Sequence, residues 1–331
     1  MGRATGAMLG LAIGDALGKR TEFLTLDEIG LLGPDWRQLP LPRKAQVTDD
    51  TQMTLALARA LRTGLAEGPL VPLRLELPLR EEFVDWWRSP DNNRAPGMTC
   101  LRSCFRLSTG RPWQDASDIG SKGCGANMRV APLGLVRELT DRQVSGASQL
   151  QSGLTHGHPT ALAASELTAF TVRWLAQGVD PAELPARLRA HAHERRTRYD
   201  EFWLGDLASR DHFGSPEAFI ARGWDECLLA LDRLDSALAA GEVDADPCER
   251  TGEGWLAEEA FATALLCFLL LPDDPVAAVR RAAVSSGDSD SLACLAGAFA
   301  GARHGEGGWP GEWVERIEYR KELLAFGALW D

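Results

Sequence analysis

The chain has 331 residues, of which 25% are charged, and its formal net charge is −12. This acidic balance argues against nucleic acid as a partner, because binding to phosphates needs clustered Lys and Arg. Apolar stretches reach only residues 4–14, too short to span a bilayer and without the flanks of a secretory signal, so we expect a cytoplasmic protein with no membrane partner.

Helix-forming residues dominate the sequence. Leucine and alanine outnumber isoleucine and valine, and apolar residues recur with a period of about 3.6 in residues 53–61, 162–175 and 261–270. No run of alternating apolar and polar residues marks a sheet. The sequence therefore predicts an all-α fold, a compact orthogonal bundle of about ten to fourteen helices in a single domain over residues 1–331.

Glycine spacing predicts that the two ends of the chain pack together. Glycine recurs at every fourth residue in 6–18 and again in 297–305. Each glycine inside a helix costs about 1 kcal/mol relative to alanine, so the repeated spacing indicates a close approach of two backbones. Contact between these segments would carry Asp15 and Glu22 towards Asp288.

The stretch VTDDT, residues 47–51, has the features of a helix start. Thr48 suits the N-cap, Asp49 and Asp50 fall in the first turn, and Asp49 with Gln52 has the spacing of a capping box. Taken alone, the pattern is explained as well by helix capping as by a chemical role.

Several segments are expected at the surface. Three proline-bearing stretches, residues 34–42, 69–78 and 90–96, are predicted loops within the same domain. The charged segment 180–211 is predicted to be an exposed helical insertion or a pair of solvated helices.

A second acidic helix start is SSGDSDS, residues 285–291. Capping by Ser286 or Asp288 explains one carboxylate, at a stabilisation of about 1 kcal/mol. It does not explain two carboxylates separated by one serine, or the similar arrangement at residues 48–50. If the two helix starts converge, several acids gather in one pocket. They are Glu22, Asp49, Asp50, Asp288 and Asp290.

Such a group of carboxylates predicts bound dications. Two carboxylates about 5 Å apart repel by roughly 3 kcal/mol at an effective dielectric constant of about 20, and nearby positive helix ends oppose protonation. An all-oxygen set that includes the hydroxyls of Thr48 and Ser291 suits Mg²⁺ or Mn²⁺, and two ions about 3.5–4 Å apart would balance the charge. The seven cysteines contain no CxxC pair, so we expect reduced thiols rather than disulfides or a zinc site.

Two glycine-bearing polar motifs lie between the helix starts. GCGANMR, residues 123–129, combines bare backbone N–H groups with an amide and a guanidinium, which suits a diphosphate, but a tight turn with Arg129 at the surface explains it equally. In THGHP, His156 and His158 either contact a sugar or base or merely precede a helix. Trp255 is either a stacking platform or, as we favour, a core anchor.

Five motifs in this order resemble the ADP-ribosylglycohydrolase family: GDALGKRTE at 14–22, VTDDT at 47–51, GCGANMR, THGHP, and GDSDS at 287–291. They spread over nearly the whole chain. The resemblance implies an all-α enzyme that binds two Mg²⁺ or Mn²⁺ ions and removes ADP-ribose from a modified protein or small-molecule substrate. RAPG at 94–97, GCGA before MR, serine in GDSDS and EYR at 318–320 are similar to the ADP-ribosylarginine hydrolase branch.

The resemblance implies roles for two sets of residues, one that holds the metal ions and one that lines the ADP-ribose cleft. The implied metal ligands are Thr48, Asp49, Asp50, Asp288, Asp290 and Ser291. The implied substrate-binding residues are Gly123, Gly125, Asn127, Arg129 and His156. The implied catalytic residues are Glu22, Asp49, Asp50 and Asp288.

Cleavage at C1″ of the ribose builds oxocarbenium character and needs a well-placed water. Our hypothesis is that the ions contact the 2″- and 3″-hydroxyls and polarise the water, while Glu22 or a metal-bound aspartate accepts its proton. Arginine is the expected acceptor. Two alternatives remain open: a hydrolase of ADP-ribose O-linked to serine or acetate, and a non-catalytic relative that binds ADP-ribose.

Overall fold

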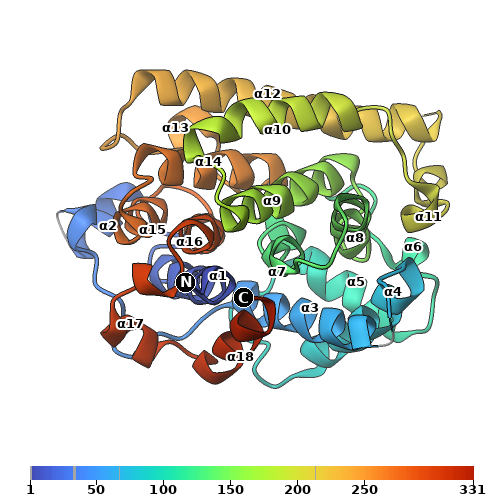
Figure 1. Ribbon diagram of the computed structural model, residues 1–331, viewed down its shortest axis with the longest axis horizontal. Coiled ribbons are helices and arrows are strands. Elements are labelled where there is room, and N and C mark those ends of the chain that lie inside the picture. The colour runs from blue at the N-terminus through green and yellow to red at the C-terminus, as the bar shows by residue number, and fades with distance from the viewer. Residues whose placement is uncertain (1, 33–34, 67, 213) are drawn as a thin grey trace.

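The computed structural model describes residues 2–32, 35–66, 68–212 and 214–331 (Figure 1). These residues form eighteen α-helices and no strand, only isolated bridges between single residue pairs. The all-α prediction is therefore confirmed. The expected ten to fourteen helices are too few, because five helices of four to six residues are too short to leave a periodic pattern. None of the described helices is long and apolar enough to cross a membrane.

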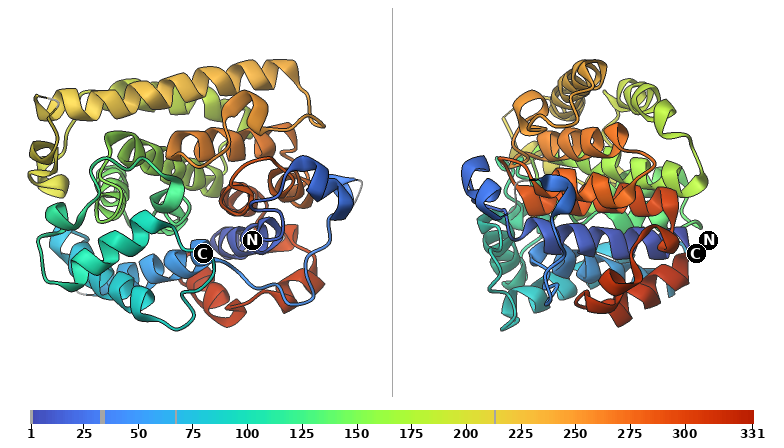
Figure 2. Two further views of the ribbon diagram at one scale, coloured as in Figure 1. Left: turned by 180° about the vertical axis from the view of Figure 1, so that it is seen from behind. Right: turned by 90° about the vertical axis from the view of Figure 1, so that its left-hand side faces the viewer.

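Loops and short 3₁₀ turns connect the helices, which Figure 2 shows from behind and from one side. Their bounds in chain order are α1 (Arg3–Gly18), α2 (Leu26–Leu32), α3 (Asp49–Ala66), α4 (Pro72–Arg88), α5 (Met98–Ser108), α6 (Trp113–Ala116), α7 (Ala131–Leu135), α8 (Asp141–Gly153), α9 (Pro159–Gln177), α10 (Leu184–Arg195), α11 (Glu201–Leu204), α12 (Pro216–Ala240), α13 (Cys248–Thr251), α14 (Ala257–Leu270), α15 (Pro275–Ala283), α16 (Ser289–His304), α17 (Gly311–Arg316) and α18 (Arg320–Trp330).

Helices α1 and α16 lie side by side at the centre of the molecule (Figure 1 and Figure 2). They run antiparallel, since Gly10 meets Gly297 and Gly14 meets Ala293. A Cβ atom at Gly10 would collide with the carbonyl oxygen of Gly297, so the absence of a side chain permits this approach. The predicted contact between the two glycine-bearing segments is confirmed, and it places the end of α1 beside the start of α16.

The remaining helices enclose this central pair. Helix α12, with α10 beside it, forms one outer edge, and α3 and α18 lie towards the opposite edge (Figure 1). Segment 180–211 contributes α10 and α11, and α10 buries Leu184, Leu188 and Ala192 in the core. The segment is therefore attached to the body of the protein through an apolar face. The single domain over residues 1–331 stays a prediction.

The proline-bearing stretches fall only partly in loops. Helix α4 begins at Pro72, so the loop predicted for 69–78 is wrong from that residue onward. Proline fits the first position of a helix because no N–H is needed there. Residues 35–42 and 90–96 contain no helix beyond one 3₁₀ turn, as expected, and Pro34 lies outside the described residues.

Candidate functional site

A cavity of about 370 Å³ lies where the end of α1 and the starts of α3 and α16 meet. Most of the predicted site residues line it. Thr48, Asn127 and Arg129 do not. The predicted residues on the cavity wall are Glu22, Asp49, Asp50, Gly123, Gly125, His156, Asp288, Asp290 and Ser291.

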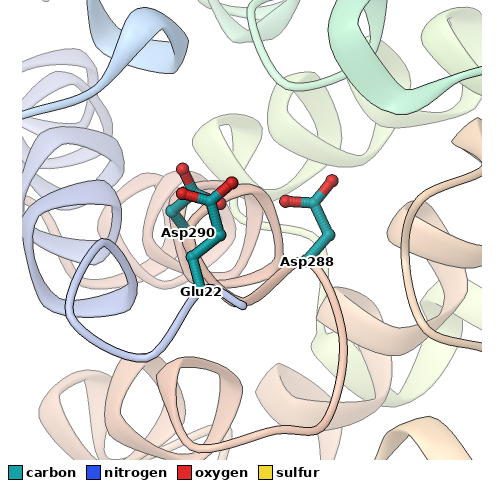
Figure 3. Close-up of side chains that lie close together, drawn as sticks. All are labelled: Glu22, Asp288 and Asp290. Carbon is teal, nitrogen blue, oxygen red and sulfur yellow. The ribbon is translucent and has the colours of Figure 1, made fainter. Parts of the chain in front are cut away.

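Three of the acids, Glu22, Asp288 and Asp290, lie close enough to share a cation. Each offers one carboxylate oxygen, and these oxygens lie within 4.8 Å of one another. Figure 3 shows the carboxylate of Glu22 next to that of Asp290, with Asp288 alongside. Glu22 follows α1 and the two aspartates open α16, so the contact between the two glycine-bearing helices creates the cluster.

The start of α16 does not use Asp288 as a cap. Asp288 occupies the N-cap position, yet its carboxylate accepts no hydrogen bond from the backbone of the helix. Instead, its Oδ2 atom lies 2.8 Å from the Cys124 Sγ atom and accepts a hydrogen bond from that thiol. The turn is held from outside the helix, because the backbone N–H of Asp288 donates to the carbonyl of Glu253 at 2.8 Å. The carboxylate is thereby left to face the cavity.

The start of α3 is capped by a residue of another helix. The buried Asp15 of α1 accepts hydrogen bonds from the N–H groups of Thr48 and Thr51 and from the Thr51 hydroxyl, at 2.6–3.1 Å. The carboxylates of Asp49 and Asp50 therefore remain available to the cavity. The glycine spacing in residues 6–18 predicts that Asp15 lies near the site, but it does not reveal this capping role.

Burial and mutual repulsion make the carboxyl groups hard to ionise. Burial, followed by the charges of Asp290 and Asp288, raises the pKa of Glu22 to about 10. The pKa values of Asp49, Asp50 and Asp288 are also raised, in each case by burial first and by Asp290 second. These acids can carry their charges together only if positive charge joins them.

The residues present fit a divalent cation. Carboxylate oxygens and the Ser291 hydroxyl are the hard oxygen donors that Mg²⁺ and Mn²⁺ prefer. The buried Asp50 Oδ2 atom has no hydrogen-bond partner among the described residues, and a metal ion would provide one. No lysine or arginine of the described chain lines the cavity, so the wall itself contains no cation to neutralise the acids.

Another part of the wall is formed by bare backbone and a neutral histidine. A Cβ atom at Gly125 would lie 3.0 Å from both the Cys100 Sγ atom and the His156 Cε1 atom, so glycine keeps this part of the wall open. Burial and the charge of Arg129 lower the pKa of His156 to about 3, which leaves the ring uncharged at neutral pH. His158 caps the start of α9 instead.

Asn127 and Arg129 support the wall from the interior. Arg129 is fully buried, with its guanidinium carbon 4.3 Å from the ring centre of Phe83 and with a hydrogen bond of 2.7 Å to the Thr155 hydroxyl. The Asn127 amide donates to the carbonyl of Ala257 at 3.0 Å. Of the two explanations of GCGANMR left open by the sequence, the tight turn with Arg129 at the surface is therefore wrong.

Aromatic side chains stand at the exposed side of the cavity. Phe23 is 69% exposed and stacks on Trp255, with 5.8 Å between the ring centres. Trp255 is 39% exposed, so the core position favoured for it is wrong. Phe23 and Ala95, both on the wall, have φ angles of 65° and 57°, a strained conformation that clusters at functional sites. The sequence misses Phe23, because no glycine or asparagine marks its left-handed backbone.

Two of the motifs similar to the arginine branch meet beside the cavity. Arg94 of RAPG donates two hydrogen bonds to Glu318 of EYR, at 2.6 and 3.0 Å. Arg94 also donates to the carbonyl of Val47, and the Val47 N–H donates to Glu318, each at 3.1 Å. The ion pair thus ties the loop that lines the cavity to the segment that leads into α3.

Comparisons with known proteins match the chain over nearly all of its length. The sequence model of the ADP-ribosylglycohydrolase family matches residues 1–331. The ADP-ribosyl-(dinitrogen reductase) glycohydrolase of Rhodospirillum rubrum is 27% identical, over 97% of this chain and 92% of its own. The ADP-ribosylarginine hydrolase Tri1 of Pseudomonas putida (strain GB-1) is also 27% identical, over 97% of this chain and 76% of its own.

A solved structure agrees with the sequence matches. The structure described as an ADP-ribosylglycohydrolase-related protein complex superposes with a TM-score of 0.66 at 26% identity, and the match covers 98% of this chain and 95% of that one. The chain therefore belongs to the ADP-ribosylglycohydrolase family and is one of its hydrolases, which act on ADP-ribose linkages.

Proposed function

We propose that this enzyme acts in the cytoplasm and hydrolyses the glycosidic bond at C1″ of ADP-ribose on modified protein side chains, with ADP-ribosyl-arginine as its main substrate. The observation that carries the proposal is the gathering of acids from two helix starts on one cavity wall, with the Asp288 carboxylate released from capping. An acidic wall favours positive charge, which develops at C1″ as the bond breaks.

Two Mg²⁺ or Mn²⁺ ions are the proposed cofactors. When bound, such ions supply Lewis acidity and lower the pKa of a water molecule. Thr48 stands behind the wall, where its hydroxyl accepts the N–H of Asp50 at 3.3 Å. The proposed ligands are Thr48, Asp49, Asp50, Asp288, Asp290 and Ser291.

Glu22, Asp49, Asp50 and Asp288 are the proposed catalytic residues. Glu22 is partly exposed, whereas the three aspartates are at most 5% exposed. Once bound cations allow it to ionise, Glu22 is therefore the acid best placed to accept a proton from the attacking water and to return it to solvent. An arginine acceptor leaves as a neutral guanidine once it is protonated, which lessens the demand for a dedicated acid.

Gly123, Gly125 and His156 are proposed to contact ADP-ribose. Bare backbone at the two glycines lets a diphosphate approach closely. The Nδ1 atom of His156 lies 2.9 Å from the Thr155 hydroxyl, so Nε2 is the ring nitrogen left for the ligand. Asn127 and Arg129 lie behind this wall, so they would affect ligand binding by supporting the wall rather than by touching the ligand.

Two observations support arginine as the acceptor. The RAPG and EYR motifs, which are similar to the arginine branch, form the Arg94–Glu318 ion pair next to the cavity. A relative that matches over 97% of this chain carries the name ADP-ribosylarginine hydrolase.

Release of ADP-ribose from arginine-, serine- and O-acetyl-linked substrates, measured side by side, tests the proposal. The arginine-linked substrate is expected to turn over fastest. Exhaustive EDTA treatment is expected to abolish turnover, and Mg²⁺ or Mn²⁺ to restore it. Asp288→Asn is expected to lose activity, whereas Glu312→Gln, whose native side chain is 76% exposed, is expected to keep it.

Three outcomes would contradict parts of this proposal. Full activity after EDTA treatment would contradict the metal dependence. Faster release of ADP-ribose from serine or acetate than from arginine would show that the main substrate is O-linked rather than arginine-linked. No release from any of the three substrates would favour the non-catalytic, ADP-ribose-binding alternative.

A further inference from the structure

A cleft of about 730 Å³ lies among α8, α9, α10 and the segment that joins α10 to α11. It shares no lining residue with the acidic cavity, whose wall contains no lysine or arginine of the described chain. Four arginines line the cleft, Arg142, Arg187, Arg195 and Arg198, and we call it the arginine cleft. In a chain of net charge −12, four guanidinium groups gathered in one cleft indicate a ligand with negative charge.

The acids of the arginine cleft already have partners, whereas its arginines have donors to spare. Asp141, Glu194 and Asp200 line the cleft, and each accepts a hydrogen bond within the protein. Arg198 donates to Glu194 through one nitrogen, at 2.9 Å, and Arg142 donates to Asp200 through Nε alone, at 3.4 Å. A guanidinium has five N–H donors, so most of those on these two arginines remain available to a ligand.

The floor of the arginine cleft is held in place by a buried carboxylate. Glu166 is fully buried behind the floor, and its Oε1 atom accepts hydrogen bonds from Ser145, His191 and the Nε atom of Arg195, at 2.7–3.0 Å. All three donors line the cleft. The bond from Arg195 uses only Nε, so its two terminal nitrogens can serve a ligand. Because Glu166 fixes the guanidinium beforehand, little side-chain entropy is lost on binding.

Aromatic rings form another part of the arginine cleft. Phe170, Trp174 and Tyr199 line it, and Trp174 is partly exposed. The ring centre of Phe170 lies 4.3 Å from that of His191 and 5.4 Å from that of Trp174. Rings beside a few fixed polar groups are typical of small-molecule sites, and the volume falls within their usual range of about 300–1,000 Å³.

We propose that the arginine cleft binds a nucleoside phosphate, separately from the acidic cavity in which the glycosidic bond is cleaved. This class of ligand joins a flat ring to a phosphate. The base would lie against the aromatic part near Trp174, and the phosphate would accept hydrogen bonds from Arg195 on the floor and from Arg142 and Arg198 beside it. Binding makes and breaks no covalent bond.

Isothermal titration calorimetry of the full-length protein in buffer with Mg²⁺ tests the site with AMP as the probe. AMP is expected to bind more tightly than either adenosine or inorganic phosphate, because only AMP occupies both parts of the arginine cleft. Arg142→Gln and Arg198→Gln are each expected to weaken AMP binding about tenfold, the ratio that corresponds to one charge-assisted hydrogen bond. Both native side chains are more than half exposed, so both variants are expected to fold.

Arg196→Gln is the matched control. Arg196 lies in the same segment but does not line the arginine cleft, and it pairs with Asp225 through two hydrogen bonds of 2.6 and 2.7 Å. Because this pair is about half exposed, its loss is expected to change AMP affinity by less than about twofold. AMP that bound in the acidic cavity would be insensitive to all three substitutions.

The proposal is overturned if AMP does not bind, if Arg142→Gln and Arg198→Gln bind it as tightly as wild type, or if inorganic phosphate binds as tightly as AMP. The last result would make the cleft a site for small anions without a place for a base. Hydrolysis is not part of the measurement, so a failure here is distinguishable from a failure of the proposed activity.

Discussion

Asp15 caps the start of α3 and thereby leaves the carboxylates of Asp49 and Asp50 available to the cavity. The first turn of a helix has N–H groups that need acceptors, and an aspartate at the start of the helix commonly provides one. Asp15 reaches across from α1 and accepts from Thr48 and Thr51, so that Asp49 and Asp50 are released from this task. One buried carboxylate thereby turns two ordinary capping positions into candidate metal ligands.

We expect Asp15→Asn to lower Mn²⁺ affinity by about 10- to 100-fold, the usual range when a partner behind a metal ligand is lost. Asparagine replaces one acceptor oxygen by an NH₂ group, which cannot accept from the N–H groups of Thr48 and Thr51. Electron paramagnetic resonance of free Mn²⁺ measures the affinity. Thr51→Val, which removes only the hydroxyl donor, is expected to lose less. Equal affinity in Asp15→Asn and wild type would show that Asp15 does not position the ligands.

Glu166 is a buried carboxylate outside the cavity. Its pKa is lowered, whereas the pKa values of the cavity acids Glu22 and Asp49 are raised. Its carboxylate accepts hydrogen bonds from Ser145, His191 and Arg195. Burial alone raises the pKa of Glu166, but the hydrogen bond from His191 and the charge of Arg195 outweigh it and lower the pKa to about 2. A folded-state pKa below the unfolded value contributes stability that is complete above about pH 4.5 and is lost as the pH falls towards 2.

Glu166→Gln is therefore expected to lower the free energy of unfolding by roughly 2–4 kcal/mol at pH 7, and by much less near pH 3, where the wild type has lost most of this contribution. Urea denaturation at several pH values measures both effects. Glu194→Gln is the control, because the Glu194 side chain is 62% exposed in its ion pair with Arg198, and a change of about 0.5 kcal/mol or less is expected. A Glu166→Gln protein with the same acid sensitivity as wild type would contradict this account.

Among the elements, the pair α1 and α16 determines whether the acids meet. Gly10→Ala would place a Cβ atom against the carbonyl of Gly297 and the ring of Trp309. Such overpacking costs about 1–3 kcal/mol, and a wider separation of the helices also moves Glu22 away from the aspartates of α16. We therefore expect Gly10→Ala to lower Tm and Mn²⁺ affinity together, as measured by calorimetry and paramagnetic resonance.

Gly30→Ala separates this effect from the general effect of replacing a helical glycine. Gly30 lies in α2, where an added Cβ atom has no atom within 4 Å. The substitution is expected to be neutral or to stabilise by up to about 1 kcal/mol. If Gly10→Ala behaved in the same way, close packing of α1 on α16 would not be what holds the acids together.

The elements that can be predicted are those whose pattern is local. Residues 162–175 and 261–270 repeat apolar positions over several turns, and they lie in α9 and α14. Helix α4 is missed at its start because Pro72 is a loop signal as well as a first-position helix residue. Its apolar positions, such as Leu75 and Phe83, are buried by packing against other helices, which no local pattern shows.

At the scale of the whole molecule, the sequence indicates which helices lie side by side. It indicates less clearly whether a side chain points into the interior or towards solvent. Glycine rows and acidic helix starts are visible in the sequence, so the approach of Glu22 to Asp288 can be predicted. The inward turn of Arg129 cannot, because it depends on Thr155 and on the ring of Phe83, both distant in the chain. The exposure of Trp255 likewise depends on the loop that carries Phe23.

Divalent cations are expected to stabilise the whole protein, because the cavity draws its acids from three distant segments, after α1 and at the starts of α3 and α16. An ion at 100 times its dissociation constant adds about 2.7 kcal/mol to the free energy of unfolding. At about 2 °C per kcal/mol for a chain of this size, we expect Tm to be about 5 °C higher in Mg²⁺ than in EDTA. Differential scanning calorimetry measures both conditions.

Asp290→Asn tests whether this gain arises at the acidic cluster. The charge of Asp290 raises the pKa values of Glu22, Asp49 and Asp288, so its removal relieves repulsion when no cation is bound. In EDTA the variant is expected to melt at or above the wild-type temperature, and in Mg²⁺ below it, because one of the proposed ligands is gone. An equal loss of Tm in both conditions would mean that Asp290 only supports the fold, and the cation would then have to bind elsewhere.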